Sequence, residues 1–238
     1  MSLSSQSLLG RVARLPLRLV PNGIEMPVMS GINAGMRWIT GTGPNRGCWL
    51  GTYEADHIPL LRELVKPGMV AYDLGANAGY FTLAFSRLVG QDGHVYAFEP
   101  EARNASDLLR NVAINHLANV SVVQAAVSES SGLVGFGGAN AIGRIGETNS
   151  YLIPAISLDE FVAGGNRMPD VVKMDIETAE VLALRGAHKV LASRIAWIME
   201  THSPELRNEC KSIMAQFGYT FVDLHPDGWN LNFVARQG

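Results

Sequence analysis

The stretch from Val70 to Phe81 constrains the fold of this chain more than any other part of the sequence. An apolar run, residues 70–74, is followed by a glycine-containing turn, and apolar residues with helical spacing begin at Ala78. The two glycines of the turn, in residues 75–79, permit a tight bend and a close approach of the backbone to a ligand. The pattern predicts a buried strand, a turn and a helix, which is the ligand-binding corner of many α/β folds.

Acidic residues stand at the ends of the first two predicted strands. Asp73 is the single charge in the first strand, and Glu99 directly follows the second strand, residues 94–98. Glu99 also lies twenty residues after Gly79, the last glycine of the turn. An acid at this distance from a glycine turn is typical of proteins that bind the ribose of a cofactor. We therefore expect Glu99 to bind ribose hydroxyls.

Two cofactor classes use this arrangement, the dinucleotides and S-adenosylmethionine. A dinucleotide fingerprint has the spacing G-x-G-x-x-G, whereas here Asn77 replaces the second glycine. Asp73 would repel a pyrophosphate, but it would suit the ammonium group of a methionine, directly or through water. The pattern therefore favours S-adenosylmethionine, with Gly75, Asn77 and Gly79 as the floor of its site. An NAD-linked oxidoreductase remains the alternative from another class of enzyme.

Strand-like and helix-like segments alternate along the rest of the chain, which predicts a doubly wound α/β fold. The last two predicted strands are joined by too few residues for a crossover helix, so we expect them to pair antiparallel. That hairpin is a second argument against a dinucleotide-binding sheet that is parallel throughout. We predict a mostly parallel seven-stranded sheet that ends in an antiparallel hairpin, with strands at residues 70–74, 94–98, 120–127, 170–176, 195–202, 219–224 and 230–235. Further helices are expected at about residues 55–65, 101–115, 180–193 and 204–217.

Residues 129–156 interrupt this alternation with scattered glycines and β-branched residues, which predicts a hairpin or a long loop. Because long loops inside compact domains tend to be functional, we expect part of a lid over the site here. The end of the third strand, residues 125–128, is expected to lie beside the first strand and near the adenine. This places Ala126 among the cofactor-binding residues.

Composition limits the remaining possibilities. Apolar residues make up 47% of the chain and charged residues 17%, with a net charge of −3, so no basic surface for nucleic acid is expected. Only two cysteines, Cys48 and Cys210, are present, which fits a reducing compartment, and we expect a cytoplasmic protein. No apolar run approaches the roughly 18 residues of a membrane span.

Residues 1–50 differ from the rest of the chain. They carry five arginines against the single acid Glu25, a net charge of +4, and many glycines and prolines. Regular structure should be short here. We expect an irregular N-terminal flank at 1–50, either a solvated segment packed on the main domain or a cap on the substrate side. Residues 51–238 then form the catalytic domain.

Several motifs together resemble the FkbM family of S-adenosylmethionine-dependent methyltransferases from about residue 47 to the end of the chain. They comprise Asp73–Tyr80, Phe98-Glu99-Pro100, Asn111 with Asn115, and Val172–Glu180, together with the segments at 51–54 and 157–161. The resemblance implies a class I methyltransferase fold and, commonly, methylation of hydroxyls on sugars, polysaccharides or polyketide-type natural products. One departure from the family pattern is Thr178, which stands where the family usually has glycine.

Candidate catalytic residues follow the fourth and fifth strands, where open α/β sheets bind their ligands. His202 is the first choice for the general base, because an unperturbed imidazole pKa of about 6.5 suits neutral pH. The alternative is a histidine that caps the next helix or is bound to a carboxylate. Asp175 is the second choice, with Glu177 and Glu200 beside it. These four side chains also offer donors for a divalent metal, but no metal is predicted.

Glu54, Tyr80 and Asp175 complete the predicted cofactor contacts. The predicted activity is O-methylation of a sugar, polysaccharide or polyketide- or peptide-type natural product. Methylation of nitrogen or carbon and a non-catalytic adenosyl-binding scaffold remain open. The partner is a small-molecule, glycan or natural-product acceptor, and the sequence specifies neither its identity nor the oligomeric state.

Overall fold

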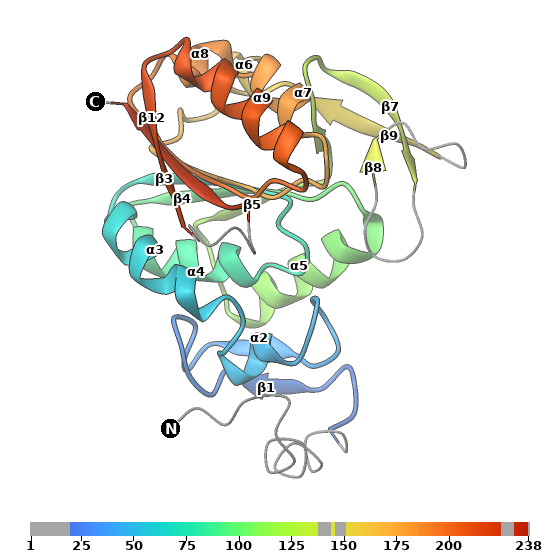
Figure 1. The fold of residues 1–238 in the computed structure, drawn as a ribbon. Helices are drawn as coiled ribbons and strands as arrows, with labels where there is room; N and C mark the ends of the chain where they lie inside the picture. The colour runs from blue at the N-terminus through green and yellow to red at the C-terminus, as the bar shows by residue number, and fades with distance from the viewer. Residues whose placement is uncertain (1–19, 138–143, 146–150, 225–230, 238) are drawn as a thin grey trace.

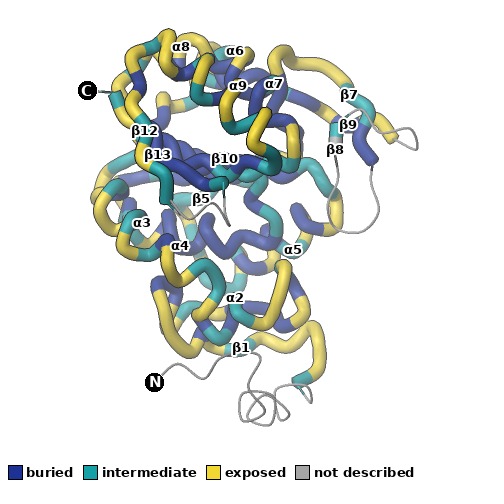
Figure 2. Tube along the Cα trace, in the orientation of Figure 1, coloured by how far each residue is buried: buried dark blue, intermediate teal, exposed yellow. Residues whose placement is uncertain are grey.

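The structure is a computed structural model that describes residues 20–137, 144–145, 151–224 and 231–237 (Figure 1). A central sheet lies between two layers of helices, and the N-terminal segment lies below one of these layers in Figure 1. The most deeply buried residues follow the central strands (Figure 2). Among the described residues, no helix is both long enough and apolar enough to cross a bilayer.

The central sheet confirms the predicted fold class. Within the described residues it has seven strands in the order β12-β13-β11-β10-β3-β4-β5. All neighbours pair in parallel except β13, which is antiparallel to both β11 and β12, so the predicted C-terminal hairpin is confirmed. The strands are β3 (Val70–Leu74), β4 (His94–Phe98), β5 (Val120–Val123), β10 (Val171–Met174), β11 (Ala196–Met199), β12 (Tyr219–Asp223) and β13 (Phe233–Gln237).

Alternation along the strands sends side chains to two separate cores. Tyr72 and Leu74 of β3 pack against one of the two helical layers, called the second layer below. Ala71 packs against the other, called the first layer. Asp73 and Lys173 are register partners in β3 and β10, so both side chains extend on the Ala71 side. The first layer contains α3 (Ile58–Leu64), α4 (Tyr80–Val89) and α5 (Ala102–Ile114); the second contains α6 (Leu158–Ala163), α7 (Glu180–Arg185), α8 (His188–Leu191) and α9 (Pro204–Ala215).

Two predicted helices differ from the observed ones. The helix expected at 55–65 begins with a 3₁₀ turn, η2 (Ala55–His57), before α3. The helix expected at 180–193 is divided into α7 and α8 at Gly186. A Cβ on Gly186 would lie 2.2 Å from the carbonyl oxygen of Ser128, so this close approach of two chain segments requires glycine at the break.

The third predicted strand is also corrected. Residues 120–127 form β5 and, after a break, β6 (Ala126–Val127), which belongs to a second sheet. The expected position beside the first strand is wrong, because β5 pairs with β4 and β6 pairs with β9. The second sheet has the order β6-β9-β7-β8, with β7 (Gly132–Gly137), β8 (Arg144–Ile145) and β9 (Tyr151–Ile156), and so confirms a hairpin in the glycine-rich segment. Parts of that segment, residues 138–143 and 146–150, lie outside the described residues.

The N-terminal segment packs on the first helical layer through β1 (Glu25–Pro27), β2 (Arg37–Ile39) and α2 (Gly47–Leu50). Trp38 is fully buried and shares a core with α4. The side chain of Asn111 on α5 accepts from the Ile39 N–H at 3.0 Å and donates to the carbonyl of Ala78 at 2.9 Å. Residues 1–19 of the predicted flank lie outside the described residues.

Candidate active site

A cavity of about 510 Å³ lies at the carboxyl ends of β3, β4 and β10. Its volume is in the range of cavities that bind cofactors and other small molecules. The second sheet contributes Phe136 and Ile145 to the lining of this cavity, and the N-terminal segment contributes Trp38. The second sheet and the N-terminal segment therefore each form part of the cavity wall. Of the predicted cofactor-binding residues, the following line this cavity: Gly75, Asn77, Tyr80, Glu99, Ala126 and Asp175.

The turn after β3 has the left-handed backbone that its sequence predicts. Gly75, Asn77 and Gly79 have φ angles of 81°, 49° and 96°. A Cβ on Gly75 would lie 1.8 Å from the carbonyl oxygen of Asp175, and one on Gly79 would lie 2.5 Å from Cδ1 of Leu108. The glycines are therefore required by protein packing, and not only by the approach of a ligand. Gly79 is not among the described residues that line the cavity.

Glu99 lies at the tip of β4 and is 5% exposed. Its Oε2 accepts from the Asn77 N–H at 2.7 Å, and its Oε1 accepts from the Glu101 N–H at 2.9 Å. Burial raises the pKa of Glu99 to about 7, and the two backbone donors oppose this shift. The side chain of Asn104 also hydrogen-bonds Glu99, and because two carboxylate oxygens have four lone pairs, one acceptor position remains. Glu99 therefore joins the glycine turn to β4 and presents an acceptor to the cavity.

Asp73 has a different position from the one expected. It is fully buried and is not among the described residues that line the cavity. Its Oδ2 accepts from the Thr82 hydroxyl at 2.6 Å. Burial raises the pKa of Asp73, and the charge of Lys173 lowers it. The expected direct contact of Asp73 with a cofactor is therefore corrected: Asp73 binds the first turn of α4 and faces the charge of Lys173.

Lys173 is a site residue that the sequence analysis missed. It is buried in β10, lines the cavity, and its Nζ lies 3.2 Å from Oδ2 of Asp175 and 4.7 Å from the centre of the Phe81 ring. The nearby charges of Asp175, Asp73 and Glu200 outweigh burial and raise the pKa of Lys173. The available signal was a lysine within the apolar run at residues 171–174, two positions before the predicted site residue Asp175.

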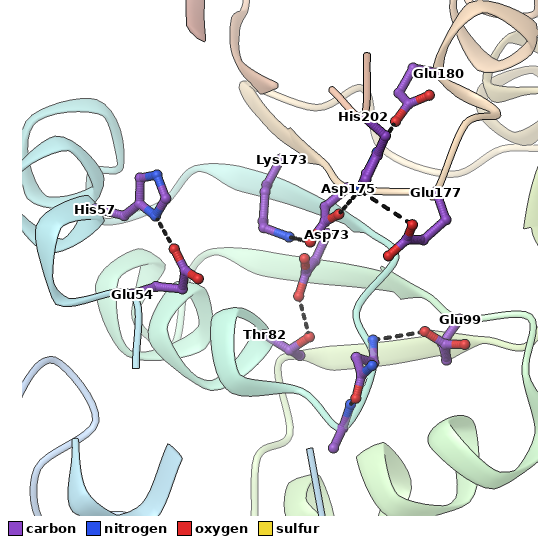
Figure 3. A network of polar contacts seen from close by, with 12 residues as sticks. Glu54, His57, Asp73, Thr82, Glu99, Lys173, Asp175, Glu177, Glu180 and His202 are labelled. Carbon is purple, nitrogen blue, oxygen red and sulfur yellow. Dashed lines mark hydrogen bonds and ion pairs between the residues drawn. The ribbon is translucent and has the colours of Figure 1, made fainter. Parts of the chain in front are cut away.

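His202 lies among three carboxylates (Figure 3). Its Nδ1 is 2.7 Å from Oε1 of Glu180, and its Nε2 is 3.4 Å from Glu177 and 3.6 Å from Asp175. The hydrogen bond to Glu180, assisted by the other two acids, raises the pKa of His202 to about 9. The imidazole is therefore protonated at neutral pH, which corrects the basis on which His202 was chosen as the general base. The alternative of a carboxylate-bound histidine agrees with this geometry.

The remaining predicted catalytic acids lie beside His202. Asp175 and Glu177 line the cavity, and Glu200 lies behind Asp175 against a second, smaller cavity. Burial and the charge of Asp175 raise the pKa of Glu200, whereas Lys173 lowers it. The structure thus brings all four predicted catalytic residues together, with Asp175 and Glu177 facing the main cavity.

Aromatic side chains form the wall beneath the turn. The ring centres of Tyr53 and Tyr80 are 5.1 Å apart, and those of Tyr80 and Phe81 are 5.7 Å apart. All three rings line the cavity. Glu54, predicted as a cofactor contact, is not among the described lining residues, and its Oε2 lies 2.8 Å from Nδ1 of His57 instead.

Two groups of described side chains bring possible metal ligands within 4.8 Å of one another: Asp175, Glu200 and His202, and Glu54, Asp56 and His57. Carboxylate and imidazole donors at this spacing suit a divalent cation. In each group the histidine already pairs with a carboxylate, Glu180 in the first and Glu54 in the second. We therefore propose no resident metal.

Comparison with known proteins identifies relatives for most of the chain. The methyltransferase FkbM domain model matches residues 73–221. The hexuronic acid methyltransferase AglP of Haloferax volcanii is 31% identical over 155 residues, which cover 63% of this chain and 63% of that protein. The match therefore spans less than two thirds of this relative's length.

Solved structures share the fold at low sequence identity. Methyltransferase FkbM from Methylobacillus flagellatus KT has a TM-score of 0.51 at 17% identity, covering 81% of this chain and 55% of that chain. A SAM-dependent O-methyltransferase from Thermotoga maritima has a TM-score of 0.52 at 12% identity, covering 93% of this chain and 80% of that chain. At these identities the likeness concerns the fold alone.

Proposed function

Because the chain belongs to the FkbM family of methyltransferases, we propose that it transfers a methyl group from S-adenosylmethionine to a hydroxyl of a sugar-type acceptor. Family membership makes the chain a methyltransferase and removes the alternative of an NAD-linked oxidoreductase. AglP is described as a hexuronic acid methyltransferase, which supports a sugar or polysaccharide over a polyketide-type acceptor. Only part of that relative aligns with this chain, so the acceptor remains a proposal.

The residues of the main cavity fit S-adenosylmethionine. Glu99 offers the remaining acceptor position of a buried carboxylate to the ribose hydroxyls, and Gly75 and Asn77 border the same space. Ala126 and Phe136 supply apolar surface for an adenine at the side of the second sheet. Tyr80 closes the opposite wall, beside Tyr53. When bound, the cofactor supplies an electrophilic methyl group.

The chain's own residues have two tasks, to orient the acceptor hydroxyl and to accept its proton. Asp175 is our candidate for the proton acceptor, because it lines the cavity and its Oδ2 lies 3.2 Å from the Lys173 ammonium. His202 and Glu177 then position Asp175, and Glu200 is the neighbouring carboxylate. The proton donated by the acceptor hydroxyl remains on a carboxylate while the oxygen–methyl bond forms and the carbon–sulfur bond breaks.

The observation that carries this proposal is that Glu99 and Asp175 line one continuous cavity from two different strand ends. A cofactor held at Glu99 and an acceptor held at Asp175 are thereby brought into the same space. The test is a methyl-donor consumption assay with methyl glycosides of hexuronic acids, neutral hexosides and hydroxylated natural products, with mass spectrometry of the products. We expect an O-methylated sugar. Protein that binds S-adenosylhomocysteine but methylates only a nitrogen or a carbon would contradict the proposal, and so would protein that methylates no compound.

A further inference from the structure

A second cavity lies behind the catalytic carboxylates, between the end of β11 and the segment that contains η2 and α3. Its volume is about 10 Å³, the space that one water molecule requires. Four polar side chains line it: His57, Lys173, Glu200 and Asn232. An internal water typically makes two to four hydrogen bonds, so this lining is sufficient to bind one.

His57 is the side chain of this cavity that leads towards the surface. It is buried, and its Nδ1 lies 2.8 Å from Oε2 of Glu54. Among the described residues, neither ring nitrogen of His57 makes a hydrogen bond of standard geometry: Nδ1 has only the close ion-pair contact to Glu54, and Nε2 has no hydrogen-bond partner. A buried ring nitrogen without a partner is costly, and a water in the adjacent cavity would satisfy it.

Glu54 connects this pair with solvent. Its side chain is 29% exposed, whereas that of His57 is 8% exposed. Glu54 also has a left-handed backbone, with φ of 47°, and although it precedes η2 it makes no capping hydrogen bond. Such a conformation is unfavourable for a non-glycine residue and is found where the surroundings enforce it, often at functional sites. In this protein, the left-handed backbone of Glu54 occurs together with the contact between its side chain and His57.

We propose that Glu200, one ordered water and the His57–Glu54 pair form the route by which the proton released on methylation leaves the buried site. The inference rests on the proposed O-methylation. The acceptor hydroxyl transfers its proton to Asp175 as its oxygen bonds the methyl carbon. Oxygens of Asp175 and Glu200 lie within 4.8 Å of one another, so a side-chain rotation that brings them to hydrogen-bond distance lets the proton pass to Glu200 and then through the water to Nε2 of His57. Nδ1 of His57 releases a proton to Glu54 and solvent, which leaves the ring as its Nε2–H tautomer. Rotation of the ring about its Cβ–Cγ bond then returns the protonated nitrogen to the Glu54 side before the next turnover.

The Asp175 side chain is 27% exposed and faces the main cavity, so a route on its other side would serve it while the cofactor and the acceptor occupy that cavity. Lys173 lines both cavities, the main one together with Asp175 and the second one together with Glu200, so its positive charge is close to both carboxyl groups. The other charged or titratable groups that act on Glu200 are Glu54, His202 and Tyr53. Burial raises the pKa of Glu200, which favours a carboxyl group that accepts a proton and then releases it.

The test compares His57→Gln and His57→Ala with the wild type, using S-adenosylmethionine and methyl glucuronide as the probe acceptor. Glutamine retains hydrogen bonding but cannot transfer a proton between two ring nitrogens. We expect kcat to fall at least about tenfold, with unchanged calorimetric affinity for S-adenosylhomocysteine. Added imidazole should restore turnover to His57→Ala, and the solvent deuterium isotope effect on kcat should rise in His57→Gln. His188→Gln, on the exposed side of α8, is the matched control and should behave as wild type.

The possible failures are distinguishable. Wild-type protein that binds S-adenosylhomocysteine but does not methylate the sugar contradicts the proposed function, and this inference with it. Normal turnover by His57→Gln in a wild type that methylates the sugar contradicts the inference alone. A loss of turnover without imidazole rescue, or with an equal loss of cofactor affinity, assigns His57 a purely structural role and also overturns the inference.

Discussion

Nδ1 of His202 lies 2.7 Å from Oε1 of Glu180, a carboxylate that is fully buried at the start of α7. The pair links the end of β11 to the helix that follows β10. Because this hydrogen bond raises the pKa of His202 to about 9, the imidazole carries a positive charge at the pH at which the enzyme is expected to work. The pair therefore contributes both to stability and to the electrostatics of the site.

This pair predicts a pH dependence of stability. The pKa of His202 is higher in the folded protein than the ordinary imidazole value of 6.5, so its contribution to stability is fully present below pH 6.5 and is lost as pH rises through about 9. We expect the free energy of unfolding to fall by up to about 3 kcal/mol between pH 6.5 and pH 9.5. Urea unfolding at several pH values measures this. The His202→Gln variant should lack this part of the decline, and an identical decline in the variant would contradict the assignment.

Thr178 provides a second prediction. It stands where the family usually has glycine, and its φ is 76°, with 50° at Glu177 before it. A β-branched residue in this region costs about 1–3 kcal/mol. We expect Thr178→Gly to raise the free energy of unfolding by about 1 kcal/mol, measured by urea denaturation. Thr220→Gly in the extended strand β12 is the control and should destabilise. A destabilised Thr178→Gly would show that the threonine side chain makes contacts that outweigh its strain.

Asn111 predicts the behaviour of the N-terminal segment. Its fully buried side chain bonds the Ile39 N–H, the Ala78 carbonyl and the Thr42 hydroxyl. Asn111→Ala removes the partner of the Ile39 N–H and of the Ala78 carbonyl, whereas the Thr42 hydroxyl keeps its bond to the Ile39 carbonyl. We therefore expect a loss of about 2–3 kcal/mol and faster amide exchange at Ile39. Hydrogen exchange followed by mass spectrometry measures the second effect. Unchanged exchange across residues 37–42 would contradict the role of Asn111 in fixing this segment.

Glu99 predicts a pH dependence of cofactor binding. Burial raises its pKa to about 7, so below that pH its carboxyl group is mostly protonated and is a weaker acceptor. Binding of ribose hydroxyls favours the ionised form, and affinity for S-adenosylhomocysteine should therefore increase about tenfold from pH 5.5 to pH 8. Calorimetric titrations across this range measure it. Glu209→Gln, a surface variant, should show the same increase, and a flat profile in the wild type would contradict the role of Glu99.

The sequence allowed the central sheet to be predicted well because its strands are short apolar runs with clear ends. β3 and β4 begin and end at the predicted residues, since each run is terminated by the polar or glycine residues that form the turn. The division of the third strand was missed because the pairing of β6 with β9 depends on a contact between segments far apart in sequence. Local propensity contains no information on such pairing.

The sequence predicted which residues lie together at the site better than it predicted their charges and contacts. Asp175, Glu177, Glu200 and His202 do lie together, as the ends of β10 and β11 require. The charge on His202 was missed because it depends on Glu180, a residue 22 positions away whose burial follows from the packing of α7. Asp73 was expected to meet the methionine ammonium directly or through water, but the alternation of β3 directs its side chain to Thr82 on α4, so it is not among the described residues that line the cavity.

The central claim is that Glu99 binds the ribose of S-adenosylmethionine in the main cavity. The most direct measurement is the calorimetric dissociation constant of S-adenosylhomocysteine for Glu99→Gln, which keeps the side-chain shape but removes the charge. We expect binding to weaken about 10- to 100-fold at pH 8, because hydrogen bonds to a charged group contribute about 1.5–3 kcal/mol. A dissociation constant within about twofold of wild type, in folded protein, would contradict the claim.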